Sequence, residues 1–364
     1  MIHGSVAPGF EAVAAIFEET LADAAGGAAF AAYRGGEPVV DLWGGERDPT
    51  TRDAWDERTV ALAFSGTKGV VATCLLMLVD RGLLSLEAPV VRYWPEFSAG
   101  GKSGVLVSHV LSHTAGVPGL RASFSAADVV GFDTMAARVA AEPPFWPPGE
   151  RLAYHGLTFG WICGELVRRV DGRTVGRFVA DELAGPLGLD FWIGLPPDRE
   201  PDVANLVPRP DYGITYLGDE PEPLLEAVYG RLHDGFWWND PGLWRPEIPG
   251  GNGIGSARAL AGVYAALPQL VRPSTLALVT TELARDRCAV TLRPYAYSTG
   301  FELQTELARF GPASDGFGHT GSGGSVHGAW PSDGIAFSYL MSELRPEAAD
   351  DRGNRLLGAL HRAR

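Results

Sequence analysis

The chain has 364 residues, of which 46% are hydrophobic and 20% are charged, a composition typical of an ordinary globular protein. Its formal net charge is −14, and no run of lysine or arginine interrupts this acidic balance. Because such a surface repels phosphate backbones, we expect no nucleic-acid partner. No stretch has the length and apolarity of a membrane span, so we expect no membrane partner either.

The first 30 residues predict an amphipathic helix rather than a signal peptide, because acidic residues interrupt every apolar run. These are Glu11, Glu18, Glu19 and Asp23. The three cysteines, Cys74, Cys163 and Cys288, lie far apart in the sequence, and two of them stand in apolar helical patterns. They are therefore expected to be buried free thiols and not a disulfide framework. Together these features predict a soluble, cytoplasmic protein.

The pattern along the chain places strands near both ends and helices in the middle. Two apolar runs flank Gly35 and Gly36, which predicts a β-hairpin. Helical spacing of apolar residues from Val70 to Leu78, followed by Gly82, predicts a helix that stops near that glycine. Further segments follow in chain order: a helix over 158–170, irregular Pro-, Gly- and Trp-rich loops over 194–251, a helix over 256–270 and antiparallel strands over 295–344.

The simplest architecture is a mixed α/β (α+β) fold, in which a central antiparallel sheet is flanked by helices and an all-helical domain is inserted. We expect residues 1–75 and 253–364 to form the α/β domain. We expect residues 76–252 to form the mostly helical domain, with its Pro- and Trp-rich loops on the substrate side.

Ser65 and Lys68 stand three residues apart at the start of the predicted helix, and so share one helix face. A serine hydroxyl is a weak nucleophile until a base takes its proton. A lysine can be that base where burial keeps it neutral. The plain alternative is that Ser65 only caps the helix. No G-x-S-x-G motif occurs, which excludes a nucleophile elbow of the α/β-hydrolase type.

Several ordered segments of the chain resemble the serine β-lactamase superfamily. S-x-x-K at Ser65–Lys68 is followed by "PPGERLAYHG" around Tyr154 and by "GHTGSGG" at Gly318–Gly324. The stretches "VSHVLSHTAGVPGL" and "EIPGGNGIGSARALAGVYAAL" are similar to the same family. The resemblance runs from about Gly26 to Leu344 and is closest to the class C-like branch, with its family VIII esterases and related acyltransferases.

The resemblance implies a role for each matching residue. Ser65 would be the acylated nucleophile, and Lys68 its general base or hydrogen-bond partner. Tyr154 would carry the proton to the leaving group and then help to activate the acceptor. The backbone N–H groups of Ser65 and Ser322 would form the oxyanion hole. Whether Lys68 or Tyr154 is the first base stays open, because their protons are coupled.

Two departures from the β-lactamase pattern favour the esterase and acyltransferase branch. Where that branch carries Tyr-x-Asn, this chain has Tyr154-His155-Gly156, which lacks the amide that grips a lactam substrate. Where β-lactamases carry K-T-G, this chain has His319-Thr320-Gly321, and an unperturbed histidine is mostly neutral at pH 7. We expect His319, Thr320 and Gly321 to bind substrate.

Other histidines and aromatic residues allow two readings. His109 and His113 have the i, i+4 spacing of a zinc pair, but the glutamate of H-E-x-x-H is missing and a structural role is favoured. His155 either lines the site or packs, Asn252 either binds substrate or ties down a turn, and His327 reads as structural. Four aromatic residues crowd the irregular loops, and of these we expect Trp237 and Trp238 to form a substrate wall. The four are Phe236, Trp237, Trp238 and Trp244.

We therefore expect a serine enzyme that works through an acyl-enzyme on Ser65, without a cofactor or a metal ion. Its partners would be a small-molecule ester or other acyl donor and, in one reading, an acyl acceptor. Hydrolysis of small or medium carboxylic esters is the first reading, and an acyltransferase of secondary metabolism, acting from an ester or thioester onto an amine or alcohol, is the second. β-Lactamase or peptidase activity and a non-catalytic binding relative are more distant, and the oligomeric state stays open.

Overall fold

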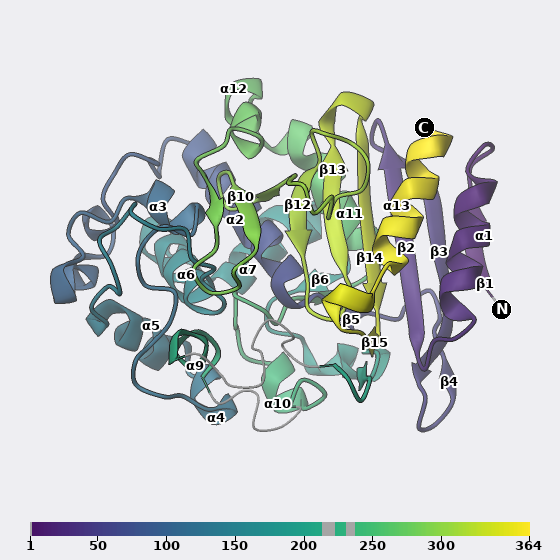
Figure 1. Cartoon of the computed structure of the whole chain (residues 1–364), viewed down its shortest axis with the longest axis horizontal. Coiled ribbons are helices and arrows are strands. Elements are labelled where there is room, and N and C mark those ends of the chain that lie inside the picture. The colour runs from purple at the N-terminus through teal and green to yellow at the C-terminus, as the bar shows by residue number, and fades with distance from the viewer. Residues whose placement is uncertain (1, 213–222, 231–236) are drawn as a thin grey trace.

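A ten-stranded antiparallel sheet forms the centre of the computed structural model, which describes residues 2–212, 223–230 and 237–364 (Figure 1). Its strand order is β1-β3-β2-β14-β13-β12-β11-β10-β9, with β4 paired to β3. The strands are β1 (Ile2–Val6), β2 (Gly27–Arg34), β3 (Glu37–Asp48), β4 (Asp53–Ala54), β9 (Ala284–Arg287), β10 (Pro294–Tyr297), β11 (Glu302–Leu303), β12 (Phe317–Thr320), β13 (Val326–Trp330) and β14 (Ile335–Met341).

The two ends of the chain meet in the middle of this sheet, where β2 pairs with β14 along its whole length. The predicted hairpin is confirmed, because β2 and β3 pair and the turn between them holds Gly35 and Gly36 at φ +59° and +89°. These left-handed values are those of a tight hairpin turn, and glycine adopts them without steric cost.

The start of the chain differs from the prediction. Residues 2–6 form the edge strand β1, and the helix α1 spans only Glu11–Leu21. β1 pairs antiparallel with β3, and it approaches so closely that a Cβ added at Gly4 would lie 1.9 Å from the Asp41 carbonyl oxygen. This pairing with a distant strand leaves no periodic signal in the first residues themselves.

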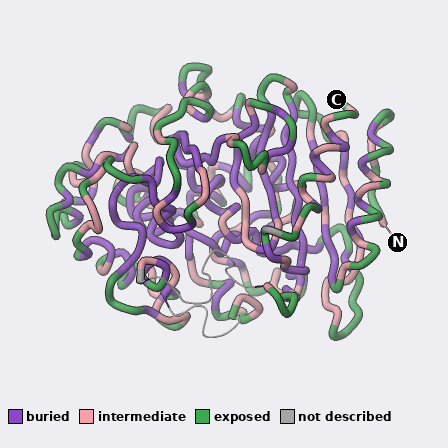
Figure 2. Tube along the Cα trace, viewed as in Figure 1, coloured by how far each residue is buried: buried purple, intermediate pink, exposed green. Residues whose placement is uncertain are grey.

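Helices cover both faces of the sheet, and the alternation of residues along β14 shows how. Ile335, Phe337 and Tyr339 face α1 and α13 (Arg352–Ala363), whereas Ala336 and Leu340 face α11 (Ala257–Leu270). A strand buried on both faces is expected to read as a continuous apolar run, as "IAFSYLM" does. Figure 2 shows this buried backbone running through the middle of the molecule, with exposed segments at the rim.

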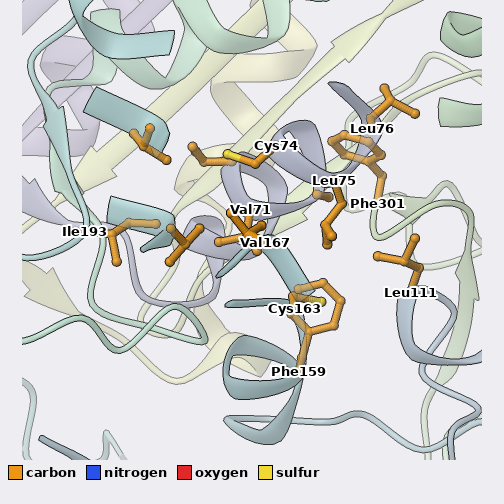
Figure 3. Close-up of a cluster of buried hydrophobic side chains, with 14 of the residues drawn as sticks. Val71, Cys74, Leu75, Leu76, Leu111, Phe159, Cys163, Val167, Ile193 and Phe301 are labelled. Carbon is orange, nitrogen blue, oxygen red and sulfur yellow. The ribbon is translucent and has the colours of Figure 1, made fainter. Parts of the chain in front are cut away.

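The middle of the chain is mostly helical and lies to one side of the sheet (Figure 1). Helix α2 (Thr67–Asp80) packs against α6 (Thr158–Asp171), and these two confirm the helices predicted after Lys68 and over 158–170. Figure 3 shows their shared apolar core, with Cys74 from α2 and Cys163 from α6. The other helices are α3 (Val107–Leu111), α4 (Ala126–Val129), α5 (Phe132–Ala141), α7 (Val175–Val179), α8 (Gly185–Leu187), α9 (Pro223–Tyr229), α10 (Pro241–Trp244) and α12 (Pro273–Leu276).

The predicted irregular region, 194–251, has only short elements in its described residues. These are a 3-10 turn (Pro197–Asp202), α9, α10 and β7 (Val207–Pro208), which pairs with β15 (Glu343–Leu344). A second small sheet joins β5 (Ala61–Leu62), β8 (Ile254–Gly255) and β6 (Phe191–Trp192). β5 directly precedes the turn that carries Ser65, so this small sheet fixes the approach to that turn.

The three cysteines are buried and unbonded, as predicted. In the described part of the chain, no helix is both long enough and apolar enough to cross a membrane. The division into an α/β domain of residues 1–75 and 253–364 and a helical domain of residues 76–252 stays a prediction.

Candidate active site

Ser65 lies in a single 3-10 turn (Phe64–Gly66) that leads directly into α2. Phe64, the residue before it, has φ +47°, a left-handed value that costs a non-glycine residue free energy and persists only where neighbours enforce it. Thr67 supplies part of that enforcement. Its hydroxyl donates to the Phe64 carbonyl at 2.6 Å and accepts from the Gly253 N–H at 2.8 Å. The serine is thereby presented on a strained, rigid turn.

Lys68 and Tyr154 converge on the Ser65 hydroxyl, as the sequence predicts. Lys68 Nζ donates to Ser65 Oγ at 3.1 Å and to the Gly250 carbonyl at 2.7 Å. Tyr154 Oη donates to Ser65 Oγ at 2.6 Å, and Lys68 Nζ lies 4.9 Å from the centre of the tyrosine ring. Hydrogen-bond contact between a hydroxyl and two groups that can exchange protons is the geometry that nucleophilic catalysis requires.

Burial changes the charge state of Lys68. Its side chain has no exposed surface, and this desolvation lowers its pKa from the ordinary 10.5 to about 7, while Cys163 nearby opposes the shift weakly. The ammonium group lies among the Ser65 hydroxyl, the Gly250 carbonyl and the Tyr154 ring, and none of these carries a charge that offsets its burial. Near pH 7, therefore, a large fraction of Lys68 is the neutral amine, which can accept the Ser65 proton.

The end of β12 lies beside the Ser65 turn. A Cβ added at Gly321 would lie 2.4 Å from the Ala63 carbonyl oxygen, so only glycine permits this approach. His319 is 1% exposed, and burial, with Lys68 as a smaller cause, lowers its pKa to about 3. His319 is therefore neutral near pH 7.

The loop that follows β12 is held by side-chain hydrogen bonds. Thr320 donates its hydroxyl to Glu302 at 3.2 Å, and the hydroxyl groups of Ser322 and Tyr212 lie 2.6 Å apart. The Gly321 N–H donates to the Ser325 carbonyl at 2.9 Å, which closes the turn around Ser322. The loop is thus fixed next to the nucleophile.

A cavity of about 930 Å³ opens at Ser65 and Tyr154. Apolar and aromatic side chains form one part of its wall, where the ring of Phe64 packs edge-on against Trp238 at 5.4 Å. The other members of this part are Leu157 and Tyr229. An ionic cluster forms another part, in which Arg309 bridges Glu302 and Glu347 at 2.7 and 2.8 Å. The cavity therefore offers both an apolar and a polar surface near the nucleophile.

Not every residue predicted to bind substrate lines this cavity. His319, Thr320, Gly321, Ser322 and Trp238 do. Trp237, which is 44% exposed, is not among the described residues that line it. His155 is fully buried, is bonded through Nδ1 to the Ala153 carbonyl at 2.6 Å, and packs against the His113 ring. Trp244 is buried and donates its indole N–H to the Trp238 carbonyl, and Phe236 lies outside the described residues.

The structure also separates the two readings of the other singled-out residues. Asn252 ties down its turn, since its amide accepts from the Ile248 N–H and donates to the carbonyls of Leu243 and Pro246. His327 is buried beside Gly66 and lies 2.7 Å through Nδ1 from the Ser338 hydroxyl.

His109 and His113 each use Nδ1 to accept a backbone N–H, from Leu106 at 3.3 Å and from His155 at 3.0 Å. Both rings are thus engaged in ordering the chain, which is the structural role favoured from the sequence.

Two contacts of the site were not predicted from the sequence. Gly250 supplies the carbonyl that accepts from Lys68, and the run of glycines in "PGGNG" was a signal for close backbone approach. Tyr229 from α9 reaches the cavity because Gly156 leaves space for it. A Cβ at position 156 would lie 2.8 Å from Val228 and 2.9 Å from Tyr229. No local pattern connects two positions 73 residues apart.

Comparisons with known proteins agree with this geometry. The family model described as Beta-lactamase matches residues 13–361. The Esterase/beta-lactamase LipL of Mycobacterium tuberculosis is 33% identical over 94% of this chain and 83% of its own. Two crystal structures, each 34% identical in sequence, align with this chain over the full length of both proteins. They are a family VIII carboxylesterase, with a TM-score of 0.92, and a penicillin-binding protein homologue from Caulobacter crescentus, with a TM-score of 0.91.

These matches confirm the predicted fold, an antiparallel sheet with surrounding helices in the β-lactamase-like arrangement. They also confirm the resemblance that Ser65, Lys68, Tyr154 and the H-T-G segment carried. With a family match over nearly the whole chain and with esterases among its relatives, this protein belongs to the beta-lactamase family of serine hydrolases.

Proposed function

We propose that this protein hydrolyses small or medium carboxylic esters through a covalent acyl-enzyme on Ser65. The observation that carries the proposal is the double contact at Ser65 Oγ, 3.1 Å from Lys68 Nζ and 2.6 Å from Tyr154 Oη, at the wall of an open cavity. A relative named as an esterase and a carboxylesterase structure of the same fold support it.

In the first half of the reaction, Ser65 Oγ attacks the ester carbonyl carbon, and its proton passes to the Lys68–Tyr154 pair. The tetrahedral oxyanion is bound by the backbone N–H groups of Ser65 and Ser322. The C–O bond to the alcohol then breaks, and Tyr154 returns the proton to the departing alkoxide oxygen. The products of this half are a neutral alcohol and an acyl ester on Ser65.

In the second half, water replaces the alcohol. Tyr154 and Lys68 take a proton from the water as its oxygen attacks the acyl carbon, and the Ser65 oxygen leaves with that proton. The acid is released and the site returns to its starting state. The Lys68–Tyr154 pair thus acts once as base and once as acid in each half of the reaction.

Two features of the cavity weigh against β-lactam or peptide substrates, which remain a distant alternative. Gly156 stands where an asparagine would hold the substrate's amide, and α9 fills the space that such a side chain needs. His319, whose pKa burial lowers to about 3, is neutral where a lysine would attract a carboxylate.

Acyl transfer to an alcohol or amine is the second candidate function, and the size of the cavity supports it. About 930 Å³ lies at the upper end of typical ligand sites, which leaves room for an acceptor alcohol or amine beside a short acyl group. In this reaction an ester or thioester donates the acyl group to Ser65, and the acceptor alcohol or amine then attacks the acyl-enzyme in place of water.

The test is hydrolysis of p-nitrophenyl acetate and butyrate by the wild type and by Ser65→Ala. We expect the wild type to release p-nitrophenol and S65A to release none. If release does not depend on Ser65, the proposed enzyme activity is refuted and a binding protein remains. Added alcohols and amines then separate the two candidates. If acid is the main product with every acceptor, hydrolysis stands, and if an acyl-acceptor product dominates, transfer replaces it.

A further inference from the structure

The backbone around Tyr154 is held from outside its own segment at three consecutive N–H groups. Ala153 N–H donates to the His113 carbonyl at 3.0 Å. Tyr154 N–H donates to Cys288 Sγ at 3.1 Å. His155 N–H donates to His113 Nδ1 at 3.0 Å. These bonds come from two sites, His113, 41 residues before Tyr154, and Cys288, 134 residues after it, so they fix the tyrosine relative to the rest of the fold.

His113 contributes through its backbone, its ring nitrogen and its ring face. The side chain is fully buried, and its ring centre lies 5.1 Å from that of Tyr154. Because Nδ1 accepts a hydrogen bond, the ring proton is on Nε2, and burial keeps the pKa of the ring well below 6.5 and the ring neutral. The residue has φ +59°, a left-handed value that a histidine adopts only where its surroundings hold it.

Cys288 contributes one acceptor atom. Its thiol is fully buried and unbonded, and the same sulfur also accepts from the Val290 N–H at 3.4 Å. The Ala289 N–H next to it donates to the Leu152 carbonyl at 2.9 Å. The connection between β9 and β10 therefore presses against the segment that carries Tyr154. Neither His113 nor Cys288 is among the described residues that line the cavity.

We propose that His113 and Cys288 are positioning residues, which hold the Tyr154 backbone so that its hydroxyl reaches Ser65 Oγ. The inference rests on the proposed function, in which Tyr154 moves the proton. A displacement of about 1 Å at such a group can cost up to about a hundredfold in rate. Loss of either acceptor is expected to lower kcat and leave KM nearly unchanged, because Tyr154 serves the reacting atoms more than the binding of the acyl chain.

Cys288 gives the cleaner experiment, with p-nitrophenyl butyrate as substrate. Cys288→Ala removes the acceptor, Cys288→Ser keeps one, and Cys74→Ala is a matched control that empties an equally buried thiol site away from Tyr154. We expect kcat to fall at least about tenfold in C288A, to recover most of the way in C288S and to stay near wild type in C74A. A folded C288A with the kcat of C74A would overturn the proposal for Cys288.

His113→Asn and His113→Leu test the other acceptor. Asparagine keeps an acceptor oxygen and tolerates a left-handed backbone, whereas leucine offers neither. We expect H113N to retain most of kcat and H113L to lose it, with circular dichroism confirming that each variant is folded. Equal kcat in the two folded variants overturns the role of the ring nitrogen, and if H113L does not fold, the C288A comparison decides the proposal alone.

Combination with Tyr154→Phe shows whether the effect passes through the tyrosine hydroxyl. The slow rates of Y154F and of Y154F/C288A can be followed as labelling of Ser65 by a fluorophosphonate. We expect C288A to add nothing in the Y154F background, because residues that act as one unit are not additive. If C288A lowers the labelling rate of Y154F by the same factor as it lowers kcat of the wild type, its effect is a general structural one and the proposal is overturned. If Y154F alone matches the wild type, it is the proposed role of Tyr154 that fails.

Discussion

In the proposed mechanism, Lys68 is the base, and its burial carries a free-energy cost. Its ammonium form is disfavoured because the side chain is fully buried, which lowers the pKa to about 7. A base with a pKa near the working pH combines a large neutral fraction with adequate basicity. Burial of the side chain therefore favours the neutral amine of Lys68 near pH 7.

The first prediction is the pH dependence of acylation. Because the neutral amine is the reactive form, kcat/KM for p-nitrophenyl butyrate should rise with pH and level off above an apparent pKa of about 7. Lys68→Arg should be slower by orders of magnitude at every pH, since a guanidinium does not lose its proton. A flat wild-type profile between about pH 5.5 and 8.5 would contradict the assignment.

The second prediction concerns stability against pH. Between pH 7 and 10.5 the unfolded lysine carries a proton that the folded one lacks, so folding releases a proton and the folded state gains stability as pH rises. Relative to Lys68→Met, the wild type should gain up to about 1.4 kcal/mol per pH unit in this window. Urea unfolding of both proteins at several pH values measures the difference, and a constant difference would show that Lys68 is not neutral in the fold.

At this scale the sequence predicted three residues that the fold brings together, but not the wall of the cavity. Ser65, Lys68 and Tyr154 were found because the chemistry requires those residue types and the order of the motifs matches a family. Trp237 and Trp238 could not be told apart, because neighbours in an irregular segment have no periodicity to show which one faces inward. His155 was placed near the site by adjacency to Tyr154 alone, and its ring is in fact fully buried and bonded to the Ala153 carbonyl.

At the scale of elements, long periodic helices and glycine turns were predicted well and edge pairing was not. The helix over 158–170 appears as α6, and the helix over 256–270 as α11. β1 was missed because it forms by pairing with the edge of β3, which lies some 40 residues further along the chain. Register and burial between distant elements are tertiary facts, and a local pattern carries no information about them.

Helix α6 gives the third prediction, because its Gly160 packs against Gly250, whose carbonyl accepts a hydrogen bond from Lys68. A Cβ added at Gly160 would lie 1.9 Å from the Gly250 nitrogen, and the Gly250 carbonyl accepts from Lys68. Helix propensity alone favours alanine over glycine by about 1 kcal/mol. Gly160→Ala should nevertheless lower both Tm and kcat, since the backbone of Gly250 must move.

Gly164→Ala is the control for that variant, one turn further along α6. Its Cβ would lie 2.9 Å from the ring edge of Phe132, a side chain that can rotate away. We expect a smaller loss of stability and wild-type kcat. If G160A and G164A have the same activity in the steady-state assay, the close contact between α6 and Gly250 does not position Lys68.

Across the whole molecule, Arg352 connects parts of the chain that meet only in the folded state. It is 2% exposed at the start of α13, pairs with Asp350 at 2.7 Å and Glu343 at 3.3 Å, and donates to the Gly323 carbonyl beside the cavity at 3.1 Å. Glu343 in turn accepts from the Ala25 N–H at the entry to β2. One guanidinium thus joins the last helix, the loop after H-T-G and the first hairpin.

The last prediction follows from this arrangement. Arg352→Met leaves the buried Asp350 carboxylate without this cation, whereas Glu343 keeps Arg345 at 2.6 Å, and the loss should cost about 3–5 kcal/mol of unfolding free energy. The control is Arg177→Met, which breaks an ion pair with Asp181 whose arginine is 69% exposed, and should cost no more than about 0.5 kcal/mol. Urea unfolding of both variants measures the costs. Equal losses would mean that the Asp350 carboxylate finds another partner. The sheet would then hold its two chain ends together by strand pairing and apolar burial alone.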